Sequence, residues 1–529
     1  MKEATRLMRF TRRETLKMMG KTTACAAAWA RTRGAFGDTA ALPITPGPFN
    51  ATRGSLDAYK VPDWFRDAKF GIWSHWGPQS GVEDGDWYAR NMYIQGSPQY
   101  DYHVKTYGHP SKVGFKDLIP KFKGSHWDPD RLMDMYVKAG AKYFVSMGVH
   151  HDNFDMWNSK YQPRWNAVAT GPMRDIVGLY KEAARERNLR FGVSDHLSNS
   201  FDWFAPSHLS DSTGPLAGVP YDGTNPAYAD LYHSYAEMPA GFAKTAQAMG
   251  RVAPDDWKLQ YFNRIKDLID QHQPDLLYID GGIPFDEYGL ATVAEVYNVS
   301  ASMHGGKVEA VYCSKVASDC GIGTCLLDHE RGVSDVIADA PWQTDTCIGD
   351  WHYKRGQEYK TPKKVIDMLV DIVSKNGNLL LNFPLPNSGE LDAEEVQVLD
   401  GITAWMALNS EGIHGSRPWK VYGAGPSTEM EVDQSGFNES KQPDLTAEDV
   451  RFTTKGKALY AFVMGIPKGE FSIKPLGSHS PQQPGKIVNV ELLGYTARLR
   501  WKQDGQALKI HMPLIKTLEI GVTFKVTLA

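Results

Sequence analysis

KFGIWSHWG, residues 69–77, is a short apolar run that ends in polar side chains, and seven later segments follow the same pattern. Short apolar runs that alternate with helical stretches are typical of a buried parallel sheet with crossover helices. Eight strands over about 320 residues fit an α/β fold, a (β/α)8 TIM-like barrel with long insertions. The predicted strands are Lys69–Trp76, Lys142–His150, Arg190–His196, Asp275–Gly281, Val308–Ser314, Thr324–Glu330, Thr344–Trp351 and Asn378–Pro384.

Helical patterns lie between several of these runs. The longest insertions follow the first strand, over 78–128, and the third strand, over 197–258. Loops at this end of a barrel build the rim of its site, so we expect both insertions to contribute to it. The predicted helices are Pro129–Ala139, Met173–Arg187, Leu259–Gln271, Pro362–Lys375 and a closing helix over 389–410.

The pattern changes after Trp419, where apolar and polar residues begin to alternate. Such alternation, broken by polar turns, indicates a small C-terminal antiparallel β-sandwich. We therefore expect a signal segment over 1–37, a linker over 38–60, a catalytic barrel over 61–419 and the β-sandwich over 420–529. The predicted sandwich strands are Ala458–Met464, Ile487–Leu493, Ala497–Lys502, Ala507–Met512 and Thr517–Thr523.

Size and charge limit the class of protein. A chain of 529 residues is too long for one hydrophobic core, and its 42% hydrophobic and 23% charged residues are ordinary for a globular protein. The net charge of −4 gives no sign of a nucleic-acid partner or of binding to an anionic membrane. Aromatic residues make up 11% of the chain, which suits either a sugar site or simply a large core.

The N-terminus has the features of an export signal. Arg12 and Arg13 form a twin-arginine pattern, followed by a weakly apolar run over Met18–Ala30. A receptor reads such a signal, and the run is too short and too polar to span a bilayer. We expect a Tat-type signal, export to the periplasm or the cell exterior, and no membrane insertion; a basic arm without this role is the alternative.

Four cysteines follow this segment: Cys313, Cys320, Cys325 and Cys347. An even number in an exported chain permits disulfides. Cys313 with Cys325, or Cys320 with Cys325, could form a pair, and free thiols remain an alternative. The cysteines have no zinc-site spacing.

Polar residues gather at the ends of six predicted strands. In this type of barrel the carboxyl ends of the strands carry the functional site. Buried charges are costly unless they are paired or used, so core packing alone does not explain six such ends. The six ends are Ser74–Gly77, His150–Asp152, Ser194–His196, Tyr278–Gly282, Asp328–Arg331 and Asp350–His352.

The histidines among these residues allow a metal site as one interpretation. His75, His150, His151 and His196 could converge, but the chain lacks the HxH pair on the first strand that metal-dependent barrel hydrolases usually show. We therefore predict no metal and no cofactor. Instead, we expect the histidines to bond to hydroxyl groups.

Asp280 is the strongest candidate for chemistry. It ends an apolar run and precedes two glycines, which would let a substrate approach the backbone. Capping of the following helix is the structural alternative. A carboxylate nucleophile requires a second carboxyl group about 5–5.5 Å away as acid/base. Glu330 is the leading candidate, with Glu287, Glu83 and Asp86 in reserve.

Five motifs resemble the α-L-fucosidases of glycoside hydrolase family 29. They occur in the order expected for the family and span residues 61–419, and the C-terminal sandwich also fits its layout. The motifs are Trp64–Pro78, Asp86–Tyr93, His150–Phe154 with Trp157–Ser159, Asp275–Gly282 and Asn376–Asn382.

The resemblance implies an exo-acting, retaining, cofactor-free hydrolase of terminal α-L-fucose on a fucosylated glycan. It implies that Asp280 is the nucleophile, while the acid/base has no fixed motif position and rests on Glu330. Tyr278 stands where many relatives have Trp, and Val149 replaces a Lys before the histidine pair. The predicted substrate-binding residues are His75, Trp76, Asp86, Trp87, His150, His151, His196, Tyr278, Arg331 and Trp351.

Three other functions remain open at this stage. The same fold could act on a related sugar such as an α-L-galactoside, or serve as a non-catalytic carbohydrate-binding protein. The C-terminal sandwich could itself bind polysaccharide. The linkage, the natural glycan and the oligomeric state are not indicated by the sequence.

Overall fold

The computed structural model describes residues 42–245, 252–321, 323–430, 437–515 and 520–529. The predicted signal segment, 1–37, lies outside these residues. Eight parallel strands form a closed barrel in the order β1 to β8, which confirms the predicted fold class. The strands are β1 Phe70–Ser74, β2 Tyr143–Val149, β3 Arg190–Asp195, β4 Leu276–Ile279, β5 Val311–Ser314, β6 Leu326–Glu330, β7 Trp342–Cys347 and β8 Gly377–Asn382.

The barrel closes where β1 pairs with β8, with Phe70 opposite Leu379. On its other side β1 pairs with β2, where Gly71 lies opposite Tyr143. A Cβ at position 71 would lie 2.3 Å from the Tyr143 ring, so this close packing of the two strands requires glycine. The strands are almost wholly buried, because helices cover them from outside.

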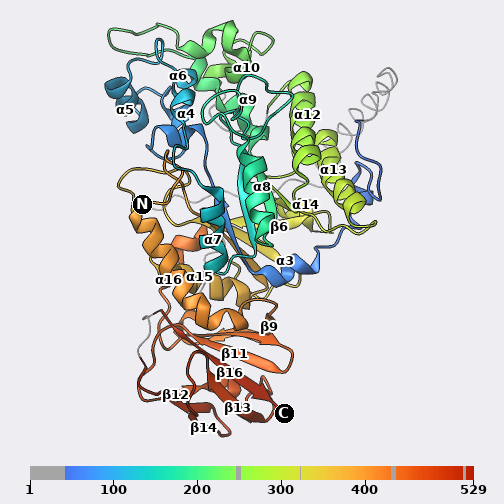
Figure 1. Ribbon diagram of the computed structural model, residues 1–529, viewed down its shortest axis with the longest axis vertical. Coiled ribbons are helices and arrows are strands. Elements are labelled where there is room, and N and C mark those ends of the chain that lie inside the picture. The colour runs from blue at the N-terminus through green and yellow to red at the C-terminus, as the bar shows by residue number, and fades with distance from the viewer. Residues whose placement is uncertain (1–41, 246–251, 322, 431–436, 516–519) are drawn as a thin grey trace, which may run out of the picture. The chain divides into compact units, whose positions relative to one another are not determined.

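Long helices surround the barrel in the part of the chain that the structure describes (Figure 1). Several begin where the sequence provides a cap: Asp128, Asp175 and Thr361 each accept a bond from a backbone N–H of the first turn. Asp392 and Glu395 form a reciprocal capping box at the start of the closing helix. The helices are α7 Pro129–Lys138, α8 Ile176–Glu186, α12 Asp255–His272, α13 Glu287–Met303, α15 Pro362–Ser374 and α16 Ala393–Asn409.

Short helices occupy the two long insertions and the segments around the barrel. Those in the first insertion and those after β3 lie at the top of Figure 1, in blue and green. Residues 44–60, part of the predicted linker over 38–60, contain α2 and bury Phe49, Leu56 and Tyr59. The short helices are α2 Arg53–Leu56, α3 Asp63–Ala68, α4 Tyr88–Asn91, α5 Pro98–Thr106, α6 Phe115–Leu118, α9 Ser200–Trp203, α10 Ala229–Tyr232, α11 Phe242–Thr245 and α14 Ala317–Cys320.

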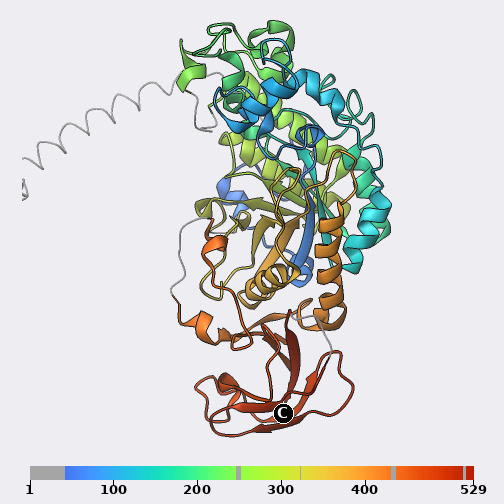
Figure 2. The same cartoon turned by 90° about the vertical axis from the view of Figure 1, so that its left-hand side faces the viewer.

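The C-terminal region forms a five-stranded and a three-stranded antiparallel sheet, drawn in red in Figure 2. Side chains from both sheets share one apolar core, among them Phe452, Leu508 and Phe524. Three strands had not been predicted: β9, β10 and β12. The strands are β9 Arg417–Ala424, β10 Val450–Lys455, β11 Ala458–Val463, β12 Glu470–Ile473, β13 Ile487–Leu492, β14 Arg500–Gln503, β15 Leu508–His511 and β16 Val522–Leu528.

A buried ion pair joins this region to the barrel helices within one compact unit, Ile44–Ala529. Arg451 of β10 donates to the carboxylate of Asp371 in α15 at 2.6 Å, and Lys375 donates to the same carboxylate at 2.7 Å. Burial raises the pKa of Asp371, but these two cations hold it below its usual value. In the part of the chain that the structure describes, no helix is long and apolar enough to cross a membrane.

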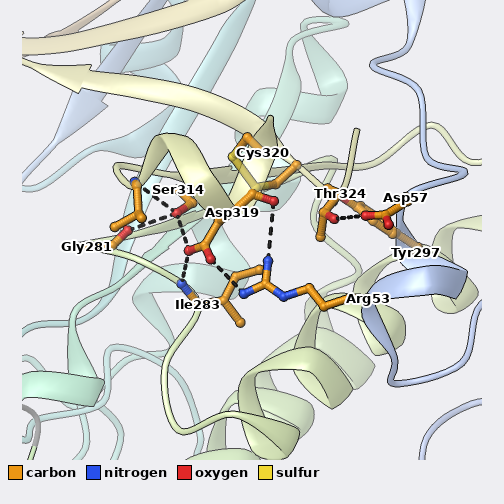
Figure 3. The surroundings of a disulfide bond; sticks show 11 residues. Arg53, Asp57, Gly281, Ile283, Tyr297, Ser314, Asp319, Cys320 and Thr324 are labelled. Atoms are coloured by element: carbon orange, nitrogen blue, oxygen red, sulfur yellow. Dashed lines mark hydrogen bonds and ion pairs between the residues drawn. A yellow bond between two sulfur atoms is a disulfide. The ribbon is translucent and has the colours of Figure 1, made fainter. Parts of the chain in front are cut away.

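Cys320 and Cys325 form a disulfide, one of the two predicted pairings, while Cys313 and Cys347 are free and buried. The disulfide closes the loop between β5 and β6 (Figure 3). Beside it, Asp319 accepts bonds from the Ile283 amide at 2.7 Å and from the Ser314 hydroxyl at 3.0 Å. This small loop therefore ties the end of β5 to the segment that follows β4.

Candidate active site

A cavity of about 290 Å³ lies at the carboxyl ends of the barrel strands, at the small end of the range for ligand pockets. Most of its walls come from the strand ends that the sequence singled out. The lining residues are Trp73, His75, Asp86, Trp87, His150, His151, His196, Tyr278, Asp280, Lys315, Glu330, Asp345, Trp351 and Phe437.

Asp280 directly follows β4 and is held at both ends. Its backbone amide donates to the Asp195 carbonyl at 3.1 Å, and Gly281 after it has a φ of +112°, which a side chain would strain. The carboxylate lies 3.1 Å from His151 Nε2 and 3.0 Å from Lys315 Nζ. Asp280 thus presents a rigidly placed carboxylate with two positively charged neighbours.

The contacts of His151 favour a protonated ring. Its Nδ1 lies 2.8 Å from the His196 carbonyl oxygen, which can only accept, and its Nε2 faces the Asp280 carboxylate, which also accepts. Both nitrogens must therefore donate, as in an imidazolium. Burial lowers the pKa of His151, but the bond to Asp280 and its charge raise it above the ordinary value.

Lys315 connects three carboxyl groups at the centre of the cavity. Besides Asp280, its ammonium contacts Glu330 Oε2 and lies 3.8 Å from Asp345 Oδ2. Two contacts of about 3 Å to one nitrogen place the Asp280 and Glu330 oxygens at most about 6 Å apart, which is compatible with the spacing of a retaining pair. Burial disfavours the Lys315 charge, yet the surrounding acids raise its pKa well above the ordinary value.

The pKa values of the two candidate carboxyl groups are shifted in opposite directions. Burial raises the pKa of Asp280, but Lys315, His151 and His196 hold it well below its usual range. Burial and the nearby acids raise the pKa of Glu330 to about 7, against the influence of Lys315. At slightly acid pH, therefore, Asp280 is ionised and most of Glu330 is protonated.

Three histidines in the same cavity are neutral. Burial lowers the pKa of His196 to about 4 and those of His75 and His150 well below the ordinary value. The Gln79 side-chain amide donates to His150 Nδ1 at 3.0 Å, which places the proton of His150 on Nε2. Within the described residues, both His75 ring nitrogens are buried without a hydrogen-bond partner, so they can bond to ligand hydroxyls.

The same histidines form two groups with the spacing of metal ligands. Candidate ligand atoms of His75, Asp86, His150 and His352 lie within 4.8 Å of one another, as do those of His150, His151 and His196. Imidazole and carboxylate would suit zinc or another transition metal. The same donors also suit sugar hydroxyls, so a chelation experiment has to separate the two uses.

Asp86 and Trp87 enter the cavity from the first insertion. His352 Nδ1 lies 2.6 Å from Asp86 Oδ1, and His150 Nε2 lies 3.9 Å from the same oxygen. His352 is fully buried and fixes Asp86 from behind. Trp87 is half-buried, with its ring centroid 6.3 Å from that of His151.

Tyr278 and Trp351 add aromatic walls. The Tyr278 hydroxyl donates to Asp345 at 2.9 Å, and Lys315 lies 5.3 Å from the centroid of its ring. Trp351 is half-buried, and the Arg331 guanidinium stacks behind it at 5.1 Å.

Two residues of the predicted substrate-binding set lie outside the cavity lining. Trp76 is 1% exposed, donates to the Pro386 carbonyl at 2.9 Å and packs against other core aromatics. Arg331 donates to Cys347 Sγ at 2.7 Å and supports Trp351 from behind. We therefore correct both assignments: Trp76 is a core residue, and Arg331 lies behind Trp351 without lining the cavity.

The structure also shows where the three alternative acid/base candidates, Glu287, Glu83 and Asp86, lie. Glu287 is exposed at the start of α13, and Glu83 pairs with Arg355 at 2.7 Å; neither lines the cavity. Asp86 does line it, but His352 holds its carboxylate. Of the predicted alternatives, Glu330 alone shares a contact with the cation that touches Asp280.

Sequence reasoning missed four residues that line the cavity, Trp73, Lys315, Asp345 and Phe437, and also His352, which contacts Asp86. Lys315 follows β5 directly, so the strand-end rule would have found it. Asp345 lies inside a strand, where a buried polar residue gives no sign of a functional role. His352 belongs to the predicted strand end Asp350–His352, but no role was predicted for it. Phe437 belongs to the C-terminal region and carries no local signal of its position.

Two family models match the chain: the α-L-fucosidase model over residues 39–411 and the α-L-fucosidase C-terminal domain model over 442–529. Tissue α-L-fucosidase of Bos taurus is 28% identical over 487 residues, covering 90% of this chain and 89% of that protein. The Homo sapiens tissue enzyme is 27% identical over 486 residues, covering 90% of each chain.

Solved structures are similar over the same length. A crystal structure of Thermotoga maritima α-fucosidase in complex with a mechanism-based inhibitor has a TM-score of 0.67 and 25% identity, covering 90% of this chain and 100% of that chain. A structure of the same enzyme with fucose has a TM-score of 0.65 and 26% identity, with the same coverage. Since the first family model spans well over half of the residues, the chain belongs to the α-L-fucosidase family, glycoside hydrolase family 29.

Proposed function

We propose that the protein hydrolyses terminal α-L-fucose from oligosaccharides or glycoconjugates, with retention of configuration. Asp280 is the nucleophile and Glu330 the acid/base. The observation that carries this proposal is the pair of carboxyl groups around Lys315, one with a lowered and one with a raised pKa. A retaining glycosidase needs both protonation states at once.

In the first step the Asp280 carboxylate attacks the anomeric carbon while Glu330 donates its proton to the leaving oxygen. The bond to the leaving group breaks, and a fucosyl ester forms on Asp280. The lowered pKa of Asp280 supports this role, because only the ionised carboxylate is a nucleophile. The raised pKa of Glu330, about 7, supports its role as an acid near neutral pH.

In the second step Glu330, now ionised, takes a proton from water. That water attacks the anomeric carbon, the ester bond to Asp280 breaks, and fucose leaves with its original configuration. The positive charges of Lys315 and His151 stabilise Asp280 as it is released as a carboxylate.

The cavity supports exo action on a single terminal sugar. Its volume, about 290 Å³, suits one sugar unit better than a chain. The unpartnered ring nitrogens of His75 and the Nε2–H of His150 offer bonds to ring hydroxyls. Trp351 offers an apolar wall to the C5 methyl group.

The central test is Asp280→Gly measured with an aryl α-L-fucoside. We expect a loss of several orders of magnitude in kcat, and recovery of part of it with external azide, giving a β-fucosyl azide. The wild-type enzyme should first release α-fucose, as followed by NMR. Near-normal hydrolysis by the variant, or initial release of β-fucose by the wild type, would refute the mechanism.

The acid/base assignment has its own test. Glu330→Ala should lose most activity on substrates with poor leaving groups and much less on α-L-fucosyl fluoride, which needs no acid. Azide should restore its turnover of activated substrates, here giving an α-fucosyl azide. Glu287→Ala is the matched control, and we expect it to hydrolyse all substrates at near-normal rates. If Glu287→Ala and not Glu330→Ala lost activity and recovered it with azide, Glu287 would be the acid/base.

We also propose that the protein is exported. The twin-arginine pattern at Arg12 and Arg13 and the run that follows it support this. The Cys320–Cys325 disulfide supports it independently, since such bonds persist mainly in oxidising compartments. Cell fractionation of a strain expressing the full chain should find activity outside the cytoplasm, and Arg12→Lys with Arg13→Lys should retain it inside. Cytoplasmic activity of the unaltered chain would contradict the proposal.

A further inference from the structure

An aromatic side chain from the C-terminal region reaches the catalytic cavity. Phe437 lies between β9 and β10 in the chain, yet it lines the same cavity as Asp280 and Glu330. It is 56% exposed, whereas the histidines and Tyr278 in that cavity are buried. Phe437 therefore lies toward the solvent side of the cavity, beyond the groups proposed to hold the terminal sugar.

The two residues after Phe437 fix it on the barrel. Asn438 exchanges hydrogen bonds with the Val333 backbone, accepting from its amide at 2.8 Å and donating to its carbonyl at 3.2 Å. The Glu439 carboxylate accepts from Thr346 at 2.6 Å and from Lys360 at 3.0 Å. Both side chains are buried, so the backbone at this point is held rigidly against the rim formed by β6 and β7.

The Glu439 amide makes a further bond, donating to the Arg331 carbonyl at 2.9 Å. Arg331 directly follows Glu330, and its guanidinium stacks behind Trp351 of the cavity wall. The position of Phe437 is thus coupled to the same short segment that carries the proposed acid/base. A group held this way can select among leaving groups without touching the bound fucose.

The backbone of Phe437 is also unusual. Its φ is +59°, in the left-handed region that bulky side chains rarely adopt. Strained conformations of this kind persist only where the surroundings enforce them, and they gather at functional sites. An exposed phenylalanine alone would mean little. Here exposure, strain and anchoring coincide at the edge of a catalytic cavity.

Core packing does not explain this residue. Among the described residues, Phe437 has no ring–ring contact with another aromatic side chain and belongs to none of the three apolar core clusters, and more than half of it is exposed. An apolar ring placed at the solvent side of a sugar site matches the C–H face of a second sugar or an aromatic aglycone. Burial of that ring would stabilise whatever is attached to the fucose.

We propose that Phe437 is a specificity-determining platform for the leaving group, binding the apolar face of the sugar or aryl unit joined to the terminal fucose. The inference rests on the proposed hydrolase function. It means that Phe437, which lies outside the barrel, takes part in choosing the substrate. The residues that hold the fucose itself remain those of the barrel.

The test compares two substrates that share the fucose but differ in the leaving group. The 4-nitrophenyl α-L-fucoside offers a ring to Phe437, whereas α-L-fucosyl fluoride offers none. Phe437→Ala should lower kcat/KM about tenfold for the aryl fucoside, the size expected for uncovering part of one ring, and less than threefold for the fluoride. Phe437→Tyr keeps the ring and should stay within threefold of wild type on both.

Tyr161→Ala is the matched control, because Tyr161 is a partly exposed aromatic, at 38%, that does not line the cavity. We expect it to leave the ratio of the two rates unchanged. An equal loss on both substrates in Phe437→Ala would overturn the platform, as would no loss on the aryl fucoside, or a Tyr variant that behaves like the Ala variant. Fluoride hydrolysis that survives in Asp280→Gly would instead count against the proposed function, so the two failures are distinguishable.

Discussion

Lys315 is the residue whose removal tests the electrostatics of the site most directly. It is the cation common to Asp280 and Glu330, and it lowers the pKa of both. The proposed mechanism requires an ionised Asp280 and a protonated Glu330 in the free enzyme. The acid limb of the kcat/KM profile therefore reports Asp280, and the alkaline limb reports Glu330, near pH 7.

Lys315→Met removes the charge and keeps most of the volume. Without the ammonium both carboxyl groups bind protons more tightly, so both limbs should move to higher pH. A unit charge 3.0 Å from Asp280 contributes about 5 kcal/mol at an effective dielectric constant of about 20. Water that enters the space left by the ammonium will offset much of this energy. If the net effect on the carboxylate is only a quarter of this energy, the limbs still move by about one pH unit, at about 1.4 kcal/mol per unit.

The assay is kcat/KM for an aryl α-L-fucoside, measured at constant ionic strength from acid to alkaline pH. Lys315→Arg is the matched control, because it retains a positive charge at this place, and its profile should keep its position. Circular dichroism and the thermal midpoint of each variant establish that the fold is intact.

The decisive quantity is the position of the profile and not its height. A Lys315→Met enzyme with a lower maximum but unmoved limbs would show that Lys315 serves packing alone. A shift to lower pH would mean that the sign of the electrostatic argument is wrong. If only the alkaline limb moved, the acid limb would not report Asp280, and Asp280 would not be the ionised carboxyl group of the mechanism.

Three further predictions concern other parts of the molecule. His151→Phe should move only the acid limb to higher pH, because His151 lowers the pKa of Asp280 and is not among the described contacts of Glu330; movement of both limbs would contradict this. Prolonged dialysis against EDTA should leave kcat/KM unchanged, whereas a loss restored by zinc would assign a metal to the histidine groups. Arg451→Met removes one of the two cations paired with Asp371 and, since Lys375 remains, should lower the free energy of unfolding by about 1–3 kcal/mol in urea titrations, a deficit that shrinks once acid protonates Asp371; an unchanged midpoint would exclude a stabilising role.

The barrel was predictable because most of its strands are buried on both faces. Such strands tend to read as short apolar runs, and six of the eight predicted runs contain a strand, while the runs Thr344–Trp351 and Asn378–Pro384 overlap β7 and β8. The C-terminal sheets were less accessible to this reasoning. β9 is half-buried along nearly its whole length, so it shows no alternation, and β12 is only four residues long. Their pairing depends on partners far away in the chain.

The site was predictable where chemistry follows a strand directly. Asp280, Glu330 and the histidines were found by this rule, because the strand ends of a barrel converge. Asp345 was missed since it lies within β7, where a polar residue reads as an interruption of the core. Trp76 was assigned wrongly for the converse reason: it follows a strand, but its ring turns into the core, and sequence position alone does not show that direction.

The donors around the acids that Lys315 contacts explain why Glu330 and not Asp280 takes the proton. Asp280, Glu330 and Asp345 lie near two cations, Lys315 and His151, while burial and Asp345 raise the pKa of Asp328, a fourth acid beside Lys315, well above its usual value. Asp280 has donors in both cations, and Asp345 has the Tyr278 hydroxyl besides Lys315. Within the described residues, the Glu330 carboxylate has a hydrogen bond from Lys315 alone. The group with the fewest donors retains its proton most easily, and this is the group that faces the leaving oxygen in the proposed mechanism.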